Sequence, residues 1–396
     1  MDVLPTTTPS KARMPAPPPA STKPTQSDVK ARAAESTSQP EKKSEEARPT
    51  KSKSKAPQVE TRPAASLEGA VLDGVRMPNA DLRNANLKKV HLRRATLVDA
   101  KLSGANLSEA QLDEANLQSV NLSGANLRGA RARNASLLGS ELGGATLADA
   151  DLTEAKLDRL DLSNVVGLSS ARLRGASMSL TVMMAADLGG IDLTKATLTN
   201  ANLMGAKLDR ATLDGARATQ CDFSQATLEM ASMREAQLDG SNFSDATMTG
   251  VSAMGASLQD AELAGAECNS TDFSSANLSG TNFEGSQLVR AIFREAICVA
   301  ANLSASTMTA ADLSQAEFRA AKIQGTKLDE VDAAGHVLGG DVAHDAVEPD
   351  PRVHLALGLD QQLGQPLPVI GVDDIGARLE GEVACFRIDS IDVEIL

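Results

Sequence analysis

Residues 103–127 read SGANLSEAQLDEANLQSVNLSGANL, and one triplet recurs in them at every fifth residue. The triplet consists of a small residue, usually Ala, then a polar residue, then Leu, as in Ala105-Asn106-Leu107. A period of five fits neither the helical period of about 3.6 residues nor the two-residue alternation of a strand. A chain that turns a corner after every five residues keeps this pattern in phase. The small residue and the Leu then point inward, and the other three residues point outward.

The repeat extends over residues 65–333 in two runs. We call the Leu position the centre of each pentad and the residue two before it the small position. The first run has 20 centres, from Leu67 to Leu162, and the second has 33, from Leu168 to Leu328. A one-residue slip at 163–167 separates them, which indicates a bulge at a corner, either tolerated or functional. None of the 106 centre and small positions is charged, although 23% of the chain is, so these positions are predicted to form the core.

This pattern predicts an all-β tube in which four pentads make one coil. Neighbouring coils would bond through their backbones at about 4.8 Å, so about 13 coils would form a rod on the order of 60 Å long. Phe223 and Phe243 are four pentads apart and are expected to stack in successive coils. The predicted core includes Leu82, Leu87, Leu107, Leu117, Leu127, Phe223, Phe243, Phe273, Phe283, Phe293 and Phe318.

The A-(D/N)-L triplets resemble those of the pentapeptide-repeat family. Ala80-Asp-Leu82, Ala85-Asn-Leu87 and Ala115-Asn-Leu117 are examples, and the resemblance covers about 270 of the 396 residues. A single triplet is not specific, but 53 of them in nearly unbroken phase are. The resemblance implies a right-handed quadrilateral β-helix. It also implies that the protein has no enzymatic activity and needs no cofactor.

Two flanking segments lack the repeat. Residues 1–64 are rich in Pro, Ser and Lys, and the chain through Ser66 holds 12 Lys and Arg against seven acids, which predicts a disordered basic tail. Residues 334–396 hold 12 acids against three Arg, and we interpret them as a small cap or a partly ordered tail. The basic N-terminal composition also suits a secretion leader or a transit peptide. The sequence leaves the localisation unknown: the default is cytoplasmic, and a secretion leader or transit peptide at the N-terminus is the alternative.

The residues that carry most enzyme chemistry are scarce. The chain has four His and four Cys, without metal-ligand spacing. Cys268 and Cys298 occupy centres and Cys221 a small position, so their thiols are predicted to be buried and unreactive. We therefore predict no catalytic, cofactor-binding or metal-binding residue, and no enzymatic activity.

Charge is unevenly distributed along the repeat. Residues 67–102 carry seven basic against four acidic residues, whereas residues 103–333 carry 17 against 29. The basic start of the repeat is a candidate docking patch for an anionic partner, and its residues are Arg83, Lys88, Lys89, Arg93, Arg94 and Lys101.

The composition favours a non-catalytic scaffold that binds a protein partner along a rigid rod. A net charge of −13 argues against direct binding of nucleic acid, and no apolar run is long enough to span a membrane. Two alternatives stay open. One is a DNA-mimic binder of a type II topoisomerase, which the resemblance suggests, and the other is a secreted or targeted protein. The sequence does not determine the oligomeric state.

Overall fold

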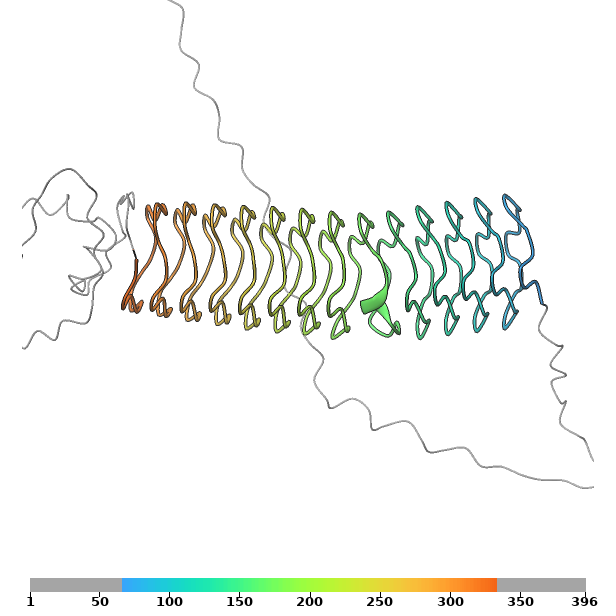
Figure 1. The fold of residues 1–396 in the computed structure, drawn as a ribbon, viewed down its shortest axis with the longest axis horizontal. Helices are drawn as coiled ribbons and strands as arrows, with labels where there is room; N and C mark the ends of the chain where they lie inside the picture. The colour runs from blue at the N-terminus through green and yellow to red at the C-terminus, as the bar shows by residue number, and fades with distance from the viewer. Residues whose placement is uncertain (1–65, 333–396) are drawn as a thin grey trace, which may run out of the picture. The chain divides into compact units, whose positions relative to one another are not determined.

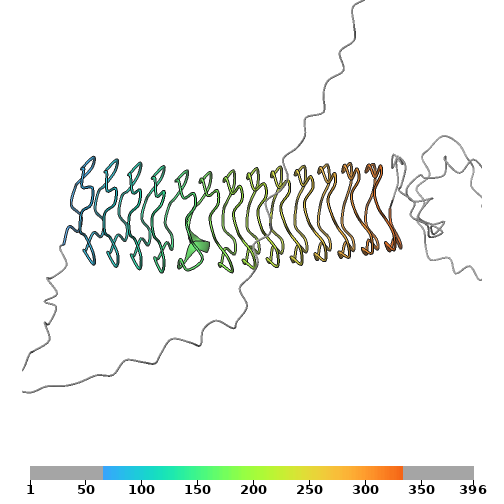
Figure 2. The same ribbon diagram turned by 180° about the vertical axis from the view of Figure 1, so that it is seen from behind.

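The computed structural model describes residues 66–332, which wind into a straight stack of coils (Figure 1 and Figure 2). The predicted tails at 1–64 and 334–396, with the expected leader and cap, lie outside the described residues. Within the described part, the one helical element is the 3-10 helix η1 (Leu168–Ser170), and all β-structure consists of single-residue parallel bridges. No helix in this part of the chain is long and apolar enough to cross a membrane.

The bridges form four rows, because the middle residues of the triplets pair with residues 20 positions further along the chain, or 21 positions across the phase slip. Each row is one side of the tube, so one coil has four sides of five residues, as the period of the sequence predicts. We number the sides by the first and last residues of their rows: face 1 from Ser66 to Lys327, face 2 from Val71 to Asp332, face 3 from Arg76 to Glu317 and face 4 from Asp81 to Lys322. The corner that follows a face takes the number of that face.

Tight turns make the corners. At the first corner the amide of Ala70 donates to the carbonyl of Leu67 over 3.0 Å, and Gly69 has a φ of 66°. A positive φ at the third of four turn residues is the type II geometry. Among residues 66–332, positive φ also occurs at 33 non-glycine residues, including Ala305 at 58°. Each of them bears a steric cost of about 1–2 kcal/mol, which the rest of the coil must outweigh.

Backbone hydrogen bonds tie each coil to the next on both sides. The amide of Asn106 donates to Ala85 of the preceding coil over 2.9 Å, and the amide of Leu107 donates to Asn126 of the following coil over 2.7 Å. The corners are bonded as well, because the amide of Gly104 donates to Ser123 over 2.9 Å. Most backbone groups of the inner coils are thereby paired, as buried backbone requires.

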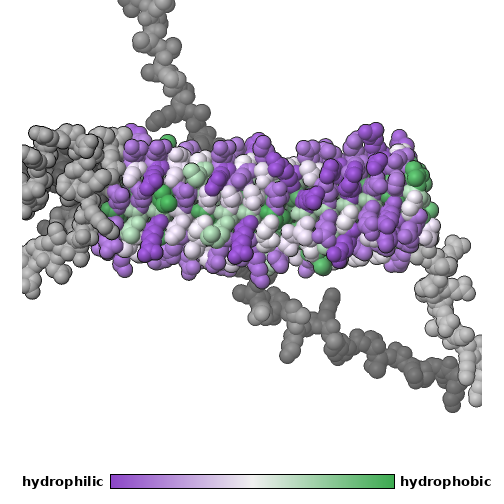
Figure 3. All heavy atoms as spheres, viewed as in Figure 1, coloured by the Kyte–Doolittle hydropathy of each residue, from purple (hydrophilic) through white to green (hydrophobic). Residues whose placement is uncertain are grey.

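One apolar cluster fills the tube. Leu82 is only partly buried, which corrects its prediction as a core residue: it lies on the first described coil, where one neighbouring coil rather than two covers it. Val71 on the same coil is 70% exposed, and Figure 3 shows apolar residues gathered at this end. The other predicted core residues are at most 2% exposed, namely Leu87, Leu107, Leu117, Leu127, Phe223, Phe243, Phe273, Phe283, Phe293 and Phe318.

Aromatic rings stack along the axis where their spacing is four pentads. Phe223 and Phe243 lie 4.7 Å apart with nearly parallel rings, and Phe273 and Phe293 lie 5.3 Å apart. Phe283 comes from the opposite face and meets Phe273 edge-on at 5.7 Å. The sequence phase predicted the stack of Phe223 on Phe243, and Phe273 and Phe293 have the same spacing. The contact across the tube depends on the width of its interior, which the phase does not specify.

The phase slip is a one-residue insertion within face 1. Beyond it Asp151 bridges Arg172, which lies one residue further along the chain than the register of the first run requires. The extra residue is Gly167, at a φ of 74°, and a Cβ there would lie 2.6 Å from the Cβ of Ala148. η1 follows directly and returns Leu168 to the core at 2% exposure. The insertion therefore lies on a face and not at the predicted corner.

Relieving one left-handed corner should stabilise the coil stack. We expect Ala305→Gly to raise the free energy of unfolding by about 0.5–1 kcal/mol, because glycine adopts a positive φ freely and loses only part of this gain to its greater entropy when unfolded. Thermal unfolding followed by circular dichroism measures the change.

The matched control is Ala301→Gly, at a small position with 0% exposure. It should lower the free energy of unfolding by about 1–2 kcal/mol, through the lost methyl group and the added chain entropy. An unchanged or lower melting temperature for Ala305→Gly would contradict the account of the corners.

Candidate functional site

The three described thiols lie inside the tube, as the repeat phase predicts. Cys221, Cys268 and Cys298 are free and at most 1% exposed. Burial raises the pKa of Cys221 to about 12, and it raises the pKa of the other two thiols as well. Among residues 66–332, no group of three His, Cys, Asp or Glu side chains could hold a metal ion. The interior of the described coils therefore offers neither a thiolate nucleophile nor a set of metal ligands.

The cations of the predicted docking patch are largely paired with acids. Arg83 bonds Asp81 on its own coil at 2.7 Å. Lys88 and Lys89 lie 3.9 and 3.5 Å from Glu109 on the next coil. Within the described residues, Lys101 is the one patch cation without an acid within 4.0 Å, and it lies on face 4.

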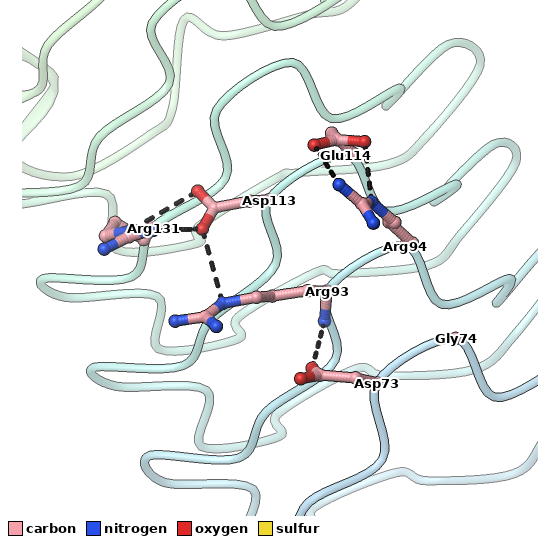
Figure 4. Close-up of a pocket in the computed structure, with 7 residues that line it drawn as sticks. All are labelled: Asp73, Gly74, Arg93, Arg94, Asp113, Glu114 and Arg131. Carbon is pink, nitrogen blue, oxygen red and sulfur yellow. Dashed lines mark hydrogen bonds and ion pairs between the residues drawn. The ribbon is translucent and has the colours of Figure 1, made fainter.

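A pocket of about 630 Å3 lies over corner 2, where two more patch cations meet acids (Figure 4). Arg94 bonds Glu114 at 2.9 Å. Asp113 lies between two arginines, at 3.8 Å from Arg93 and 2.5 Å from Arg131. The lining consists of three arginines, three acids and a glycine: Asp73, Gly74, Arg93, Arg94, Asp113, Glu114 and Arg131.

Equal numbers of positive and negative side chains give this pocket no formal net charge. The hydrogen bond to Arg94 lowers the pKa of Glu114 and raises that of Arg94, so both partners stay charged near neutral pH. The chemistry of the pocket is that of a surface ion-pair network, in which each exposed pair contributes at most about 1 kcal/mol. Docking of an anionic partner on the patch stays a prediction.

Sequence reasoning missed these pairs because it counted charges along the chain and did not place them around the coil. A signal was available: Lys89 and Glu109, like Arg94 and Glu114, are four pentads apart. In this fold that spacing stacks two side chains on adjacent coils. A comparison of the charges of residues four pentads apart would have predicted ion pairs in place of a free cationic patch.

Asp151 is the one charged residue among 66–332 that is buried, at 6% exposure. Burial is the largest single influence and raises its pKa, but Thr153 and Arg133 act together against it. The Oγ1 of Thr153 donates to it over 2.7 Å, and the Nε of Arg133 lies 2.6 Å away. Together they hold the pKa of Asp151 below its ordinary value. The carboxylate is thus a charged structural link between coils.

Comparison with protein-family models identifies the class. A model described as "Pentapeptide repeat region" matches residues 71–147. A second, "Pentapeptide repeats (8 copies)", matches residues 133–166, 168–200, 186–225, 219–252, 256–294 and 296–332. The chain belongs to the pentapeptide repeat family, whose fold is the right-handed quadrilateral β-helix. A sequence comparison with curated proteins gives no match.

Several solved structures share the fold. HetL from the cyanobacterium Nostoc sp. strain PCC 7120, involved in heterocyst differentiation regulation, is 25% identical, with 56% of this chain and 87% of that one covered and a TM-score of 0.32. Full-length QnrB1, a plasmid-mediated fluoroquinolone resistance protein, is 16% identical, with 53% of this chain and 96% of that one covered and a TM-score of 0.30. Rfr23 from the cyanobacterium Cyanothece 51142 is 22% identical, with 34% of this chain and 85% of that one covered and a TM-score of 0.19. These likenesses concern the fold alone.

The link at Asp151 should make stability depend on pH. Because folding lowers the pKa of Asp151, its carboxylate contributes fully to stability at pH values above its unfolded pKa of about 3.9. That contribution is lost as the pH falls through the folded pKa. We expect Asp151→Asn to cost about 1–2 kcal/mol at pH 7 and to flatten the fall in melting temperature from pH 5 to pH 2. The control is Asp149→Asn, whose exposed pair with Arg128 should contribute little. Equal effects of the two variants would contradict this role.

The buried thiols should be inert until the protein unfolds. In a Cys385→Ser background, we expect Ellman's reagent at pH 8 to modify fewer than about 0.1 thiols per native chain, because none of the three described thiols is exposed or ionised. In 6 M guanidinium chloride all three should react. Glu229→Cys at an exposed corner, added to this background, is the positive control. Fast labelling of the native chain without this added thiol would show that the coils open.

Proposed function

We propose that the protein is a non-catalytic scaffold that binds a protein partner along the outer faces of its coil stack. The observation that carries the proposal is the division between inward and outward positions, which runs the length of the repeat. Apart from the slip, each pentad directs two small or apolar residues into the tube and three residues outward. The interior thus supplies rigidity, and the outward rows supply all the chemistry available for recognition.

The backbone pairing supports rigidity over the length of the stack. Backbone bonds of 2.5–3.1 Å join the coils on each face, as at Leu107 and Asn106. A rigid surface loses little conformational entropy when a partner binds, which favours affinity. Outward residues can also vary without disturbing the core, so one fold can present very different surfaces.

A topoisomerase-binding protein is the second candidate. Acids on face 4 that lack a cationic neighbour favour it, because a protein that replaces DNA in a cationic groove needs uncompensated negative charge. Duplex DNA carries one charge per about 1.7 Å, a density that the stack reaches on no face as a whole. An assay of DNA supercoiling by gyrase with added protein tests this candidate. The third alternative, a secreted or targeted protein, depends on residues 1–64, which lie outside the described residues.

Cross-linking of the full chain in a lysate of its host, followed by mass spectrometry, tests the scaffold proposal. We expect a reproducible partner whose cross-links reach outward lysines such as Lys195, Lys207 and Lys322. The control bait is Phe243→Asp, which places a charge in the stacked core and should unfold the coils. Equal capture by both baits, or no cross-link within residues 66–332, would contradict the proposal.

A further inference from the structure

Face 4 and its two flanking corners contain a long strip without positive charge. The strip consists of seven consecutive coil segments: 179–185, 199–205, 219–225, 239–245, 259–265, 279–285 and 299–305. The described residues contain 24 Lys and Arg, yet none lies in these segments. The strip does contain six acids, namely Asp222, Asp239, Asp245, Asp260, Glu262 and Glu284. We call it the face-4 strip.

None of these six acids makes an ion pair within residues 66–332, unlike Asp113 and Glu114 over corner 2. The groups that bond them are neutral. Asp222 accepts a hydrogen bond from the Oγ of Ser224 at 2.6 Å and another from the Nδ2 of Asn242 at 3.3 Å. Because such bonds leave the carboxylate charge uncompensated, the strip presents a negative potential along one side of the stack.

Asparagines from successive coils hold the outward row of the strip in place. The Nδ2 of Asn282 bonds Glu262 on the preceding coil, and the Nδ2 of Asn302 bonds Asn282 at 2.9 Å and Glu284 at 3.3 Å. Asp222, Glu262 and Glu284 therefore have fixed neighbours before any partner arrives. Binding then requires less ordering of side chains, which favours affinity.

The first two segments of the strip are uncharged and partly apolar. Leu180 is 47% and Met184 is 37% exposed. Val182 lies between them on face 4, and Met204 lies one coil after Met184 at corner 4. The strip thus has an apolar end beside the slip and an acidic body beyond it.

The spacing of successive coils sets the distance between the apolar end of the face-4 strip and its acids. Val182 and Asp222 are two coil steps apart, which is about 10 Å at the usual strand spacing of about 4.8 Å. The acidic coils from Asp222 to Glu284 span three further steps, or about 14 Å. A partner that matches the strip would carry an apolar group, a gap of about three extended residues, and then several cations over about four residues.

We propose that the face-4 strip docks an extended basic segment of a partner protein, with an apolar side chain of that segment against Leu180 and Met184 and its Lys or Arg side chains along the acids. This inference rests on the proposed scaffold function and specifies its surface and the chemistry of its partner. Uncompensated acids attract such a segment, and the apolar end fixes its direction and register.

The test uses the full chain and a fluorescein-labelled peptide, LLSSKSKSKS, in anisotropy titrations at 50 mM salt. The strip variant Asp222→Asn, Glu262→Gln, Glu284→Gln removes three charges while keeping side-chain shape. The matched control, Asp192→Asn, Glu267→Gln, Asp272→Asn, removes three acids on faces 1 and 2 that make no ion pair either. Circular dichroism melting checks that both variants fold.

We expect the strip variant to weaken binding about tenfold or more, since each exposed ion pair is worth up to about 1 kcal/mol. The control should weaken it less than about twofold, through the general field alone. Equal losses in both variants would mean unspecific attraction and overturn the proposal. Unchanged binding in the strip variant would overturn it too.

A second arm tests the apolar end. Leu180→Ser with Met184→Gln should weaken binding of LLSSKSKSKS about threefold or more and leave SSSSKSKSKS unaffected, because only the first peptide buries apolar surface there. Met230→Gln, at a corner on the other side and 66% exposed, is the control and should change neither affinity.

Equal losses for both peptides would overturn the apolar contact. If the strip variants still cross-link the natural partner on other faces, the scaffold function stands and this inference fails.

Discussion

The parallel bridge between residues 20 positions apart is the interaction on which the structure depends. It places each coil directly over the last, so the amides of Asn106 and Leu107 find carbonyls on the coils before and after. To keep that register, the chain must turn four corners in every coil. This forces left-handed backbone at residues such as Ala305, and the ladder and the buried core outweigh the steric cost.

The same register sets the surface chemistry. A side chain on an outward row has its nearest neighbours four pentads away along the chain, so charge placed at that spacing either pairs or accumulates. Arg94 and Glu114 pair over corner 2, whereas Asp222 and Glu262 alternate with asparagines and meet no cation. Neighbouring faces of one rod can therefore be electrically different while their cores are nearly identical. A fold of this kind separates recognition from stability.

The fold and its interior could be predicted from the sequence because the two depend on the same five-residue phase. Phe223 stacks on Phe243 as the spacing indicates, and the thiols of Cys268 and Cys298 are buried. The errors arose where the phase carries no information. Leu82 is half covered because it lies on an end coil, and the pairing of the basic patch required reading charges around the coil.

The sequence by itself determined the five-residue coil, its inward residues and the existence of one insertion, since a period of five over 53 centres fits neither a helix nor a strand. Only the tertiary structure decided which outward residues become neighbours. It placed the insertion at Gly167, where a Cβ would clash with Ala148, and it brought six acids together in the cation-free face-4 strip. The physical reason is that surface contacts form between adjacent coils, whose facing residues are four pentads apart along the chain. The insertion lengthens that separation by one residue where it occurs.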